Sequence, residues 1–201
     1  KPHTRFLRGL VGPEMGIRDG NCNQTFPYTI IRNILSNKMD KMSCQFCEIM
    51  EHNQIIAVPT VAIGPTEYDI VTGRSRNIVS AKHNAVAAGH GRIGQNTLLI
   101  TPEYGNMVWL YAVLLDTAFE PDDILLGDPC PKGCYLCIDH CPVHALGAPA
   151  LKQTVCYSHA FGGENGGNWK IKCYTCRIIC PSCFGSKNWH MKSKQKVFTD
   201  I

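Results

Sequence analysis

The sequence predicts an α+β fold, with an α/β portion over residues 1–120 and a cysteine-rich portion over residues 121–201. Three observations lead to this division. Apolar residues recur at every third or fourth position over residues 28–53, which is typical of a long amphipathic helix. Short apolar runs rich in β-branched residues follow and predict strands. Eight of the twelve cysteines then lie between positions 130 and 180, in a stretch rich in turn residues.

The long helix is flanked by two less regular segments. Residues 1–27 are rich in Gly, Pro, Asn and Asp, and we expect an irregular lead-in there. After the helix, residues 55–64 (IIAVPTVAIG) predict a strand. Because proline has no backbone N–H to donate, Pro59 places that strand at the edge of a sheet or interrupts it.

The rest of the α/β portion predicts a helix followed by two strands. Residues 80–91 (SAKHNAVAAGHG) form the helix, which Gly89 or Gly91 closes. Residues 97–100 (TLLI) and 107–116 (MVWLYAVLLD) predict the strands, and the turn TPEYGN joins them.

Composition and charge narrow the function classes. Hydrophobic residues make up 44% and charged residues 18% of the 201 residues, which is a globular balance. The longest apolar run, residues 108–118, is shorter than the roughly 20 residues of a membrane helix and contains Asp116, so we expect no membrane partner. The net charge of +4 comes from scattered bases without an aromatic–basic motif, so we do not expect nucleic acid as a partner. The sequence also shows no charged segment followed by an apolar run of the kind that forms a secretory signal.

Residues 89–94 (GHGRIG) match the G-x-G-x-x-G pattern of dinucleotide-binding sites. That pattern works where a strand precedes it and a helix follows, because the pyrophosphate then meets the helix N-terminus. Here the predicted order is reversed. We therefore interpret the glycines as permitting a tight helix-to-strand connection, or the close approach of the backbone to another ligand.

Two cysteine motifs follow one another in the cysteine-rich portion. The first is C-x3-C-x2-C-x3-C-P, and the second, after an isolated cysteine, is C-x2-C-x3-C-P. Both end like the bacterial ferredoxin run C-x2-C-x2-C-x3-C-P, whose fourth cysteine binds the other of two clusters. Such short spacings favour a metal centre over disulfides. Together the motifs and the isolated cysteine supply eight thiolates, the number that two [4Fe–4S] clusters require.

The crossed arrangement of the ferredoxin run predicts which cysteines share a cluster. Three sulfurs of a short loop wrap one cluster, and the cysteine before the proline turns toward the other. The first gap is one residue longer than usual, and Gly133 can absorb the extra residue. The alternative is a pair of zinc sites, which do not require the repeated x3-C-P ending. One cluster is assigned to Cys130, Cys134, Cys137 and Cys180, and the other to Cys141, Cys156, Cys173 and Cys176.

The remaining cysteines carry weaker predictions. Cys44 and Cys47 lie one turn apart on the predicted long helix, and we expect them to be core residues. Cys22 allows no interpretation. Cys183 is a substitute ligand if Cys180 is not the last ligand of its motif.

Residues 82–105 (KHNAVAAGHGRIGQNTLLITPEYG) and residues 134–146 (CYLCIDHCPVHAL) resemble the epoxyqueuosine reductase family and its relatives, the corrinoid-dependent reductive dehalogenases. The resemblance covers residues 75–181, and A-G-x-G-x-x-G-x-N-x-L-L-I-x-P-E-x-G is its most specific element. It implies a nitroreductase-like, cobalamin-binding α/β domain joined to a bacterial ferredoxin-like domain with two [4Fe–4S] clusters. In such a protein electrons pass through the clusters to a corrinoid cobalt, which performs the reduction. The resemblance implies cofactor binding by Gly89, Gly91, Gly94 and Asn96.

The resemblance is less informative about catalytic residues. When the chain is aligned with the family backwards from the GHGRIG element, the catalytic aspartate of the family is expected near position 75. This chain has Ser75 there, and the nearest acidic residue upstream is Asp69. We therefore expect an iron–sulfur oxidoreductase other than epoxyqueuosine reductase itself, with its catalytic residues unknown. The candidate proton donors are His83, Tyr104 and Tyr68, and the candidate hydrogen-bond partners of cluster sulfur are His140 and His144.

Two functions remain open. The first is an oxidoreductase that passes electrons to a bound corrinoid or another cofactor and reduces a small organic substrate. The alternative is a ferredoxin-like electron-transfer protein without a substrate site of its own. Both need a low-potential electron donor of the ferredoxin or flavodoxin type, and a homodimer is compatible with either. Two low-potential clusters are oxygen-sensitive, so we expect an anaerobic, cytoplasmic setting.

Overall fold

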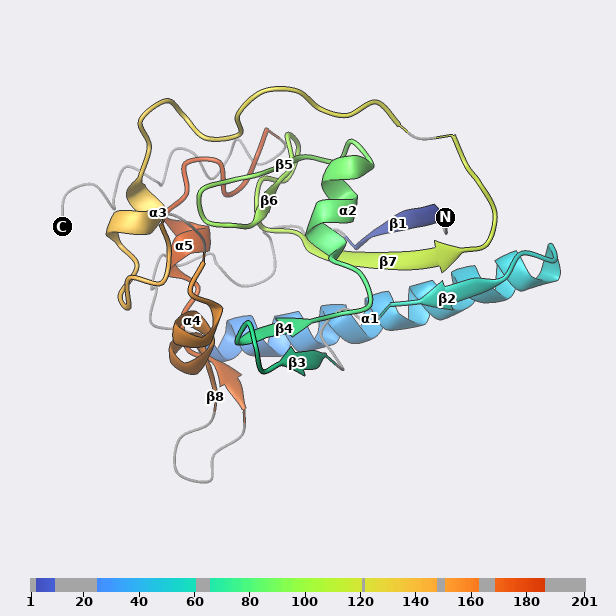
Figure 1. Ribbon diagram of the computed structural model, residues 1–201, viewed down its shortest axis with the longest axis horizontal. Coiled ribbons are helices and arrows are strands. Elements are labelled where there is room, and N and C mark those ends of the chain that lie inside the picture. The colour runs from blue at the N-terminus through green and yellow to red at the C-terminus, as the bar shows by residue number, and fades with distance from the viewer. Residues whose placement is uncertain are drawn as a thin grey trace.

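The computed structural model describes residues 3–9, 25–60, 66–120, 122–147, 151–162 and 169–186. Its helices are interspersed with short runs of strands along the chain (Figure 1). In chain order they are β1 (His3–Gly9), α1 (Thr25–His52), β2 (Ala57–Pro59), β3 (Glu67–Asp69), β4 (Arg74–Arg76), α2 (Ala81–Ala87), β5 (Arg92–Ile93), β6 (Leu99–Ile100), β7 (Trp109–Leu115), α3 (Leu136–Asp139), α4 (Gln153–Ala160), β8 (Phe161–Gly162), β9 (Lys170–Ile171) and α5 (Thr175–Ile178).

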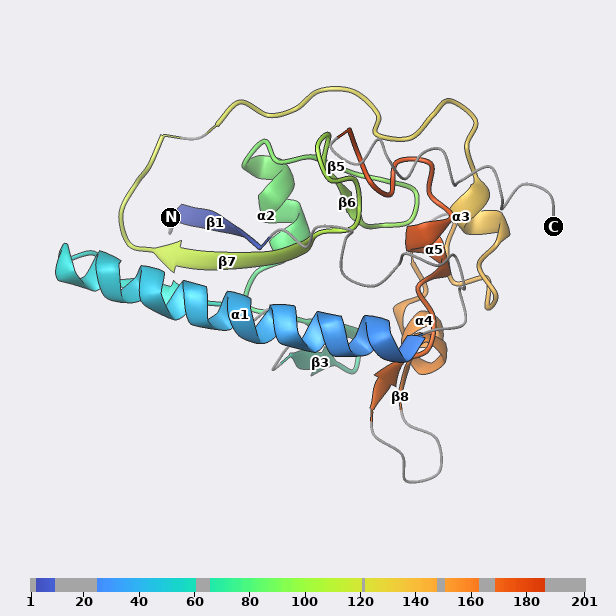
Figure 2. The same cartoon turned by 180° about the vertical axis from the view of Figure 1, so that it is seen from behind.

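A three-stranded antiparallel sheet of order β1-β7-β2 packs against the long helix α1. The helix runs beneath β7 along the length of the molecule (Figure 2). Apolar side chains fill the space between helix and sheet, as the helical periodicity of the sequence requires. This part of the core contains Met39, Cys47, Ala57, Tyr111, Val113 and Leu115.

The predictions for this region are confirmed except at its start. Helix α1 occupies Thr25–His52, close to the predicted range, and the strand that contains Pro59 lies at an edge of the sheet. The expectation of an irregular lead-in was wrong for His3–Gly9, which pair with β7 over their full length. Residues 61–64 of the predicted strand and Cys22 lie outside the described residues.

Helix α2 precedes strand β5, which confirms the predicted order of helix and strand around the GHGRIG segment. Gly89 closes the helix with a φ of 69°, a left-handed conformation that glycine adopts without steric penalty. The next strands, β5 and β6, form a short hairpin. A tight turn with mutual backbone hydrogen bonds between Thr101 and Gly105 then leads into β7.

The cysteine-rich portion forms short helices and one small hairpin, β8–β9. Figures 1 and 2 show α3, α4 and α5 gathered at one end of the molecule, beside the N-terminal end of α1. The two portions share a core there, because Tyr28 of α1 stacks on Tyr174 with ring centroids 4.3 Å apart. The division at residue 120 stays a prediction, and the shared core means that the two portions fold against each other.

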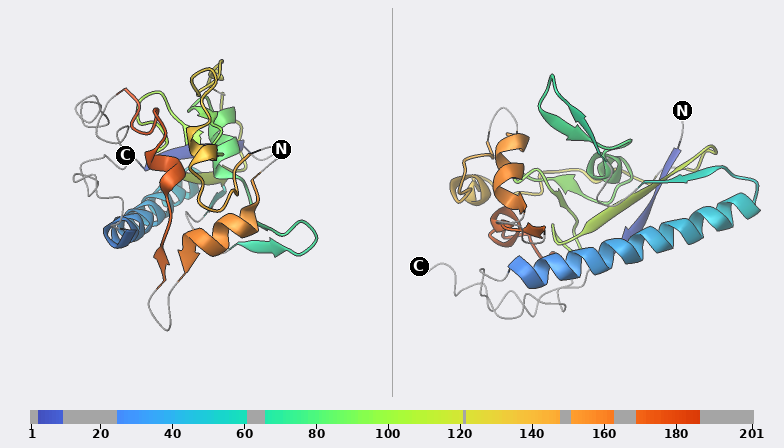
Figure 3. Two further views of the ribbon diagram at one scale, coloured as in Figure 1. Left: turned by 90° about the vertical axis from the view of Figure 1, so that its left-hand side faces the viewer. Right: turned by 90° about the horizontal axis from the view of Figure 1, so that it is seen from below.

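A second hairpin, β3–β4, was not predicted from the sequence. It projects from the body of the molecule, most clearly in the right-hand view of Figure 3. Its turn is tied to α4, because the Thr154 hydroxyl donates to the Gly73 carbonyl (2.9 Å) and the Ser75 N–H donates to the Gln153 side chain (3.2 Å). Within the described part of the chain, no helix has the length and apolar character to cross a membrane.

Candidate metal centre

The first cysteine motif is a turn followed by one helical turn. Cys134 N–H donates to the Pro131 carbonyl (3.0 Å), and Gly133 adopts a φ of 74°, so the extra residue of this motif is taken up in a tight turn. Helix α3 then carries Cys137 inward, where it is buried. The helix ends before Cys141, which is also buried and packs in the same core cluster as Cys137.

The second motif repeats this design with α5. Cys156 comes from α4, Cys173 precedes α5, Cys176 lies on α5, and Cys180 follows it and is buried. The Thr175 hydroxyl lies 3.5 Å from the Cys173 sulfur. Helices α3 and α5 pack against each other, so the two motifs form one cysteine-lined region.

Four thiols of this region interact with one another across the two motifs. The pKa of Cys137 is raised first by burial and then by the neighbouring thiols of Cys180, Cys130 and Cys134. The pKa of Cys180 is likewise raised by burial and by Cys130 and Cys134. The last cysteine of the second motif therefore lies among the first three cysteines of the first. We refer to Cys130, Cys134, Cys137 and Cys180 as set A.

The other four thiols form a second neighbourhood, and we refer to Cys141, Cys156, Cys173 and Cys176 as set B. Burial, followed by Cys141 and Cys173, raises the pKa of Cys156. Burial raises the pKa of Cys176 to about 12, and Cys156 and Cys173 contribute, while Arg177 opposes them. A weaker influence of Cys137 on Cys176 means that the two sets are adjacent.

The donor chemistry of both sets fits iron–sulfur clusters. Cluster ligands are thiolates, which N–H donors stabilise. The Gln95 N–H donates to the Cys130 sulfur (3.4 Å), and the Ala145 N–H donates to the Cys141 sulfur (3.3 Å). Burial alone raises the pKa of Cys141, but backbone N–H donors, foremost those of Ala145 and Leu146, outweigh it and lower the pKa below the ordinary value.

The spacing of the thiols also bears on the zinc alternative. Among the described residues, no three Cys, His, Asp or Glu side chains converge on the position of a single metal ion. A structural zinc site requires such convergence, because all ligands bind the same ion. In a four-iron cluster each thiolate binds a different iron atom, so thiols that surround a larger volume are the expected arrangement.

Two buried asparagines of the α/β portion hold the second motif in place. The Asn96 amide donates to the Cys176 carbonyl (3.1 Å), and the Asn106 amide donates to the Arg177 carbonyl (3.2 Å). The Arg177 guanidinium in turn donates to the Asn106 carbonyl and lies over the Trp109 ring, 5.0 Å from its centroid. The Asn106 and Arg177 contacts were not predictable from the sequence, because Asn106 lies in a predicted turn and is more than 70 positions away from Arg177.

The residues expected to bind a cofactor are packed against the chain itself. A Cβ at Gly89 would collide with the Asp123 carbonyl, and a Cβ at Gly91 or Gly94 would collide with Ile100. Asn96 is 3% exposed, and its amide oxygen accepts the Leu98 N–H (3.1 Å). These contacts explain Gly89 and Gly91 as sites of close backbone approach, whereas Gly94 packs against the Ile100 side chain. They give no support to corrinoid contacts, which stay a prediction.

The three candidate proton donors lie in different surroundings. His83 is exposed, and its ring lies 2.6 Å from the Ser80 hydroxyl. Tyr104 packs against the core cluster of Ala85 and Val108. Tyr68 is 62% exposed on β3. No shared position for a substrate follows from these three side chains.

The histidines that flank the first C-P pair make local contacts. The His140 ring lies 3.0 Å from the Leu136 carbonyl at Nδ1 and so bonds to its own helix. At His144 the backbone N–H, and not the ring, hydrogen-bonds the Cys141 sulfur and helps to lower its pKa. Cys47 is buried against the sheet, as expected for a core residue, whereas Cys44 is exposed on α1. Cys183 is fully buried beside Phe184, and its role as a substitute ligand stays a prediction.

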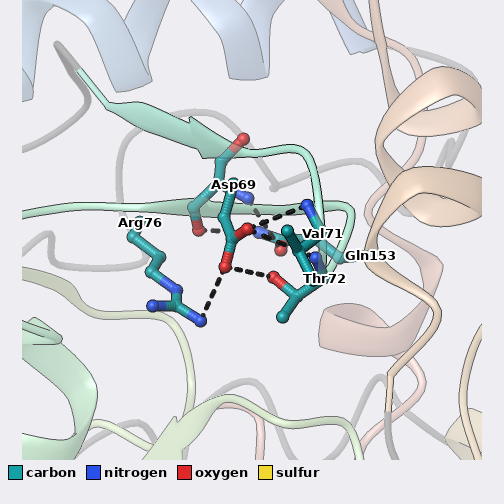
Figure 4. A network of polar contacts seen from close by, with 6 residues as sticks. Asp69, Val71, Thr72, Arg76 and Gln153 are labelled. Atoms are coloured by element: carbon teal, nitrogen blue, oxygen red, sulfur yellow. Dashed lines mark hydrogen bonds and ion pairs between the residues drawn. The ribbon is translucent and has the colours of Figure 1, made fainter.

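Asp69, the nearest acid upstream of Ser75, holds the turn of the β3–β4 hairpin. Figure 4 shows its carboxylate turned toward Val71, Thr72 and Arg76. It accepts the Thr72 hydroxyl (2.7 Å) and the Val71 N–H (2.9 Å), and it forms an ion pair with Arg76 (2.9 Å). A carboxylate occupied in this way has a structural role in the turn.

These contacts predict a pH effect that is local to the hairpin. The Thr72 hydroxyl, then the Thr72 and Val71 N–H groups, and finally Arg76 lower the pKa of Asp69 below its ordinary value of 3.8. The contacts therefore stabilise the turn above the ordinary pKa and are lost as the pH falls through the lowered one. Replacing Thr72→Val should raise the pKa of Asp69, and by more than Arg76→Gln, whose charge is screened by solvent. An NMR titration of the carboxyl carbon measures both, and a larger shift in Arg76→Gln would contradict the assignment.

Curated relatives of this chain are epoxyqueuosine reductases. The enzyme of Listeria monocytogenes is 35% identical over 107 residues, which are 48% of this chain and 28% of the relative. That of Bacillus subtilis is 33% identical over 127 residues (58% and 32%), and that of Gloeobacter violaceus is 32% identical over 127 residues (55% and 38%). No protein-family model matches the chain. The chain thus spans about a third of the length of the curated relatives it matches.

Solved structures of the same enzyme share the fold. Epoxyqueuosine reductase from Streptococcus thermophilus superposes with a TM-score of 0.51 at 20% identity, over 78% of this chain and 41% of that structure. A selenomethionine-labelled epoxyqueuosine reductase gives a TM-score of 0.50 at 24% identity, over 78% and 39%. The mixed α/β fold is therefore that of epoxyqueuosine reductase structures. The names of the curated relatives also speak against our expectation, based on Ser75, that this chain differs from that enzyme.

Proposed function

We propose that this chain holds two [4Fe–4S] clusters and conducts electrons through them in a reduction of the epoxyqueuosine reductase type. The observation that carries the proposal is the grouping of eight cysteine thiols into two sets of four, each drawn from both motifs. A grouping across motifs is what the ferredoxin run requires, because its last cysteine binds the other cluster.

In this proposal set A binds one cluster and set B binds the other. Each cluster would supply reversible one-electron transfer. The protein contributes thiolates, N–H donors to their sulfurs and apolar surroundings. Among these surroundings are Ile138, Val143 and Ile179, which pack around Cys137 and Cys141. Such surroundings limit the access of water and so help to set the reduction potentials.

The proposed substrate class follows the relatives, whose name states that they reduce epoxyqueuosine. One structure of that enzyme contains an epoxyqueuosine-modified tRNA stem loop. We expected no nucleic acid from the charge alone, and the relatives leave that expectation without support. Because the chain spans about a third of these enzymes, we propose a role in this reaction and not a complete catalytic site.

The proposal includes no step at a corrinoid. The four residues for which the resemblance implies cofactor binding contact other residues of the chain itself, so we assign them no part in the reaction. The electron donor is proposed to be a low-potential ferredoxin or flavodoxin, and the proposed setting is cytoplasmic and anaerobic because exposed clusters are oxygen-sensitive.

Metal analysis of anaerobically purified protein tests the proposal. Iron, sulfide, zinc and cobalt are measured per chain, before and after incubation with cobalamin. We expect about eight irons and about eight sulfides, little zinc, and cluster absorption that dithionite bleaches. Zinc in place of iron would overturn the proposal. Eight irons without cobalt and without turnover of epoxyqueuosine would favour the electron-transfer alternative. Bound cobalt would instead mean that a corrinoid takes part in the reaction.

A further inference from the structure

Asn106 occupies a buried position between the α/β portion and the second cysteine motif. It is 1% exposed and follows the turn that ends at Gly105, three residues before the start of β7 at Trp109. Its backbone N–H donates to the Cys183 carbonyl (3.1 Å), and its side-chain amide donates to the Arg177 carbonyl (3.2 Å). These bonds fix the backbone on both sides of Cys180.

The Asn106 side chain also reaches the Cys180 sulfur, with which it forms a hydrogen bond. An amide nitrogen carries two hydrogens, so it can serve the Arg177 carbonyl and a sulfur at once. The amide oxygen of Asn106 is buried without a hydrogen-bond partner among the described residues. The amide is therefore held by its N–H donors, and these face the cysteine motif.

Asn96 provides a natural comparison. It is 3% exposed and it also donates to a backbone carbonyl of the second motif, that of Cys176 (3.1 Å). The Asn96 oxygen, however, accepts the Leu98 N–H, and no described contact joins its side chain to a sulfur. Asn96 and Asn106 thus hold the same loop, but of the two side chains only that of Asn106 forms a hydrogen bond with a cysteine sulfur among the described residues.

Set A receives hydrogen bonds from the α/β portion as well as from its own loop, whereas the donors described for Cys141 of set B come from its own loop. The Gln95 N–H donates to Cys130, and Cys180 is hydrogen-bonded first by the Ser182 backbone and then by the Asn106 side chain. The donors to Cys141 come from residues 143–146. The α/β portion can therefore influence the set A cluster separately from the set B cluster.

We infer that Asn106 is a positioning residue that raises the reduction potential of the cluster held by Cys130, Cys134, Cys137 and Cys180. The inference rests on the proposed function, since it requires that cluster. Reduction adds one electron, and the added negative charge spreads onto the ligating sulfurs. An N–H donor to a sulfur stabilises the reduced cluster more than the oxidised one, so the potential rises.

Redox titration followed by EPR tests this inference in Asn106→Leu, with Asn96→Leu as the matched control. Both variants remove a buried amide that holds the same loop, but only the first removes a donor to sulfur. We expect Asn106→Leu to lower the reduction equilibrium constant of one cluster about tenfold, a downward shift of about 59 mV for a one-electron couple. The other cluster, and both clusters of Asn96→Leu, should keep their wild-type potentials.

If Asn106→Leu does not fold, Asn106→Asp keeps the size of the side chain and replaces the donor by an acceptor, and it should lower the same potential. Unchanged potentials in a variant with full iron content would overturn the inference while leaving the proposed function intact. Equal shifts in Asn106→Leu and Asn96→Leu would also overturn it, because a structural effect would then explain both. Wild-type protein without clusters would overturn the proposed function itself, and the inference with it.

Discussion

Replacing Gly105 with alanine is expected to lower the free energy of unfolding by about 4 kcal/mol or more, which is exceptional for a single added methyl group. Gly105 has a φ of 62°, a left-handed conformation that already penalises alanine by about 1–2 kcal/mol. The position that a side chain would take at Gly105 faces the backbone of the second cysteine motif. A Cβ there would overlap the carbonyl oxygens of Ser182 and Cys183, and backbone atoms cannot move aside as a flexible side chain can.

Gly73 provides the matched control for Gly105→Ala. Its φ of 63° imposes the same conformational penalty, but a Cβ would make only ordinary contacts, with the Thr154 hydroxyl at 3.5 Å and the Tyr68 hydroxyl at 3.9 Å. Gly73→Ala should therefore cost about 1–2 kcal/mol, and the difference between the two variants isolates the overlap with the motif. Denaturant unfolding followed by circular dichroism measures both. Equal losses of stability would mean that the turn and the cysteine motif are not packed as described.

The parts of the fold that the sequence predicted are those with a local signal. The periodicity of α1, the proline at the edge strand and the glycine that closes α2 each act through neighbours in the chain. Strand β1 has no such signal, because its apolar residues Phe6 and Leu7 are adjacent and do not alternate with polar ones. Its pairing with β7 joins residues more than 90 positions apart, and that register is a property of the folded molecule.

The candidate metal centre likewise has a part that was predictable from the sequence and a part that was not. The cysteine spacings predicted two sets of ligands, because the geometry of a short loop around a cluster is local. The contacts that connect these loops to the rest of the protein were not predictable. Asn106 precedes a strand and is typical of a turn, and nothing in its neighbourhood indicates a sulfur partner more than 70 positions away. Likewise, Gly105 gave no indication that it faces Ser182 and Cys183.

Double substitution of cysteines should reveal which thiols share a cluster, with a loss of either half or nearly all of the iron. In Cys134→Ala/Cys180→Ala both changes fall in set A, so one cluster is lost and about four irons remain. In Cys176→Ala/Cys180→Ala the changes fall in different sets, although both cysteines belong to the second motif, so nearly all iron is lost. The physical reason is that each cluster needs four thiolates, and the Cys180 thiol lies among those of Cys130 and Cys134.

The opposite assignment, in which each cluster is bound by consecutive cysteines, reverses both outcomes. Cys176→Ala/Cys180→Ala would then keep about four irons, and Cys134→Ala/Cys180→Ala would lose nearly all. Cys44→Ala controls for the loss of a thiol as such, because Cys44 is exposed on α1 and belongs to neither set. Iron and sulfide per chain, measured with circular dichroism to confirm folding, separate the two assignments. Because set A joins the first motif to Cys180, its cluster would also link the first motif to the segment that Asn106 and Gly105 contact, so that cluster loading and packing of this region depend on each other.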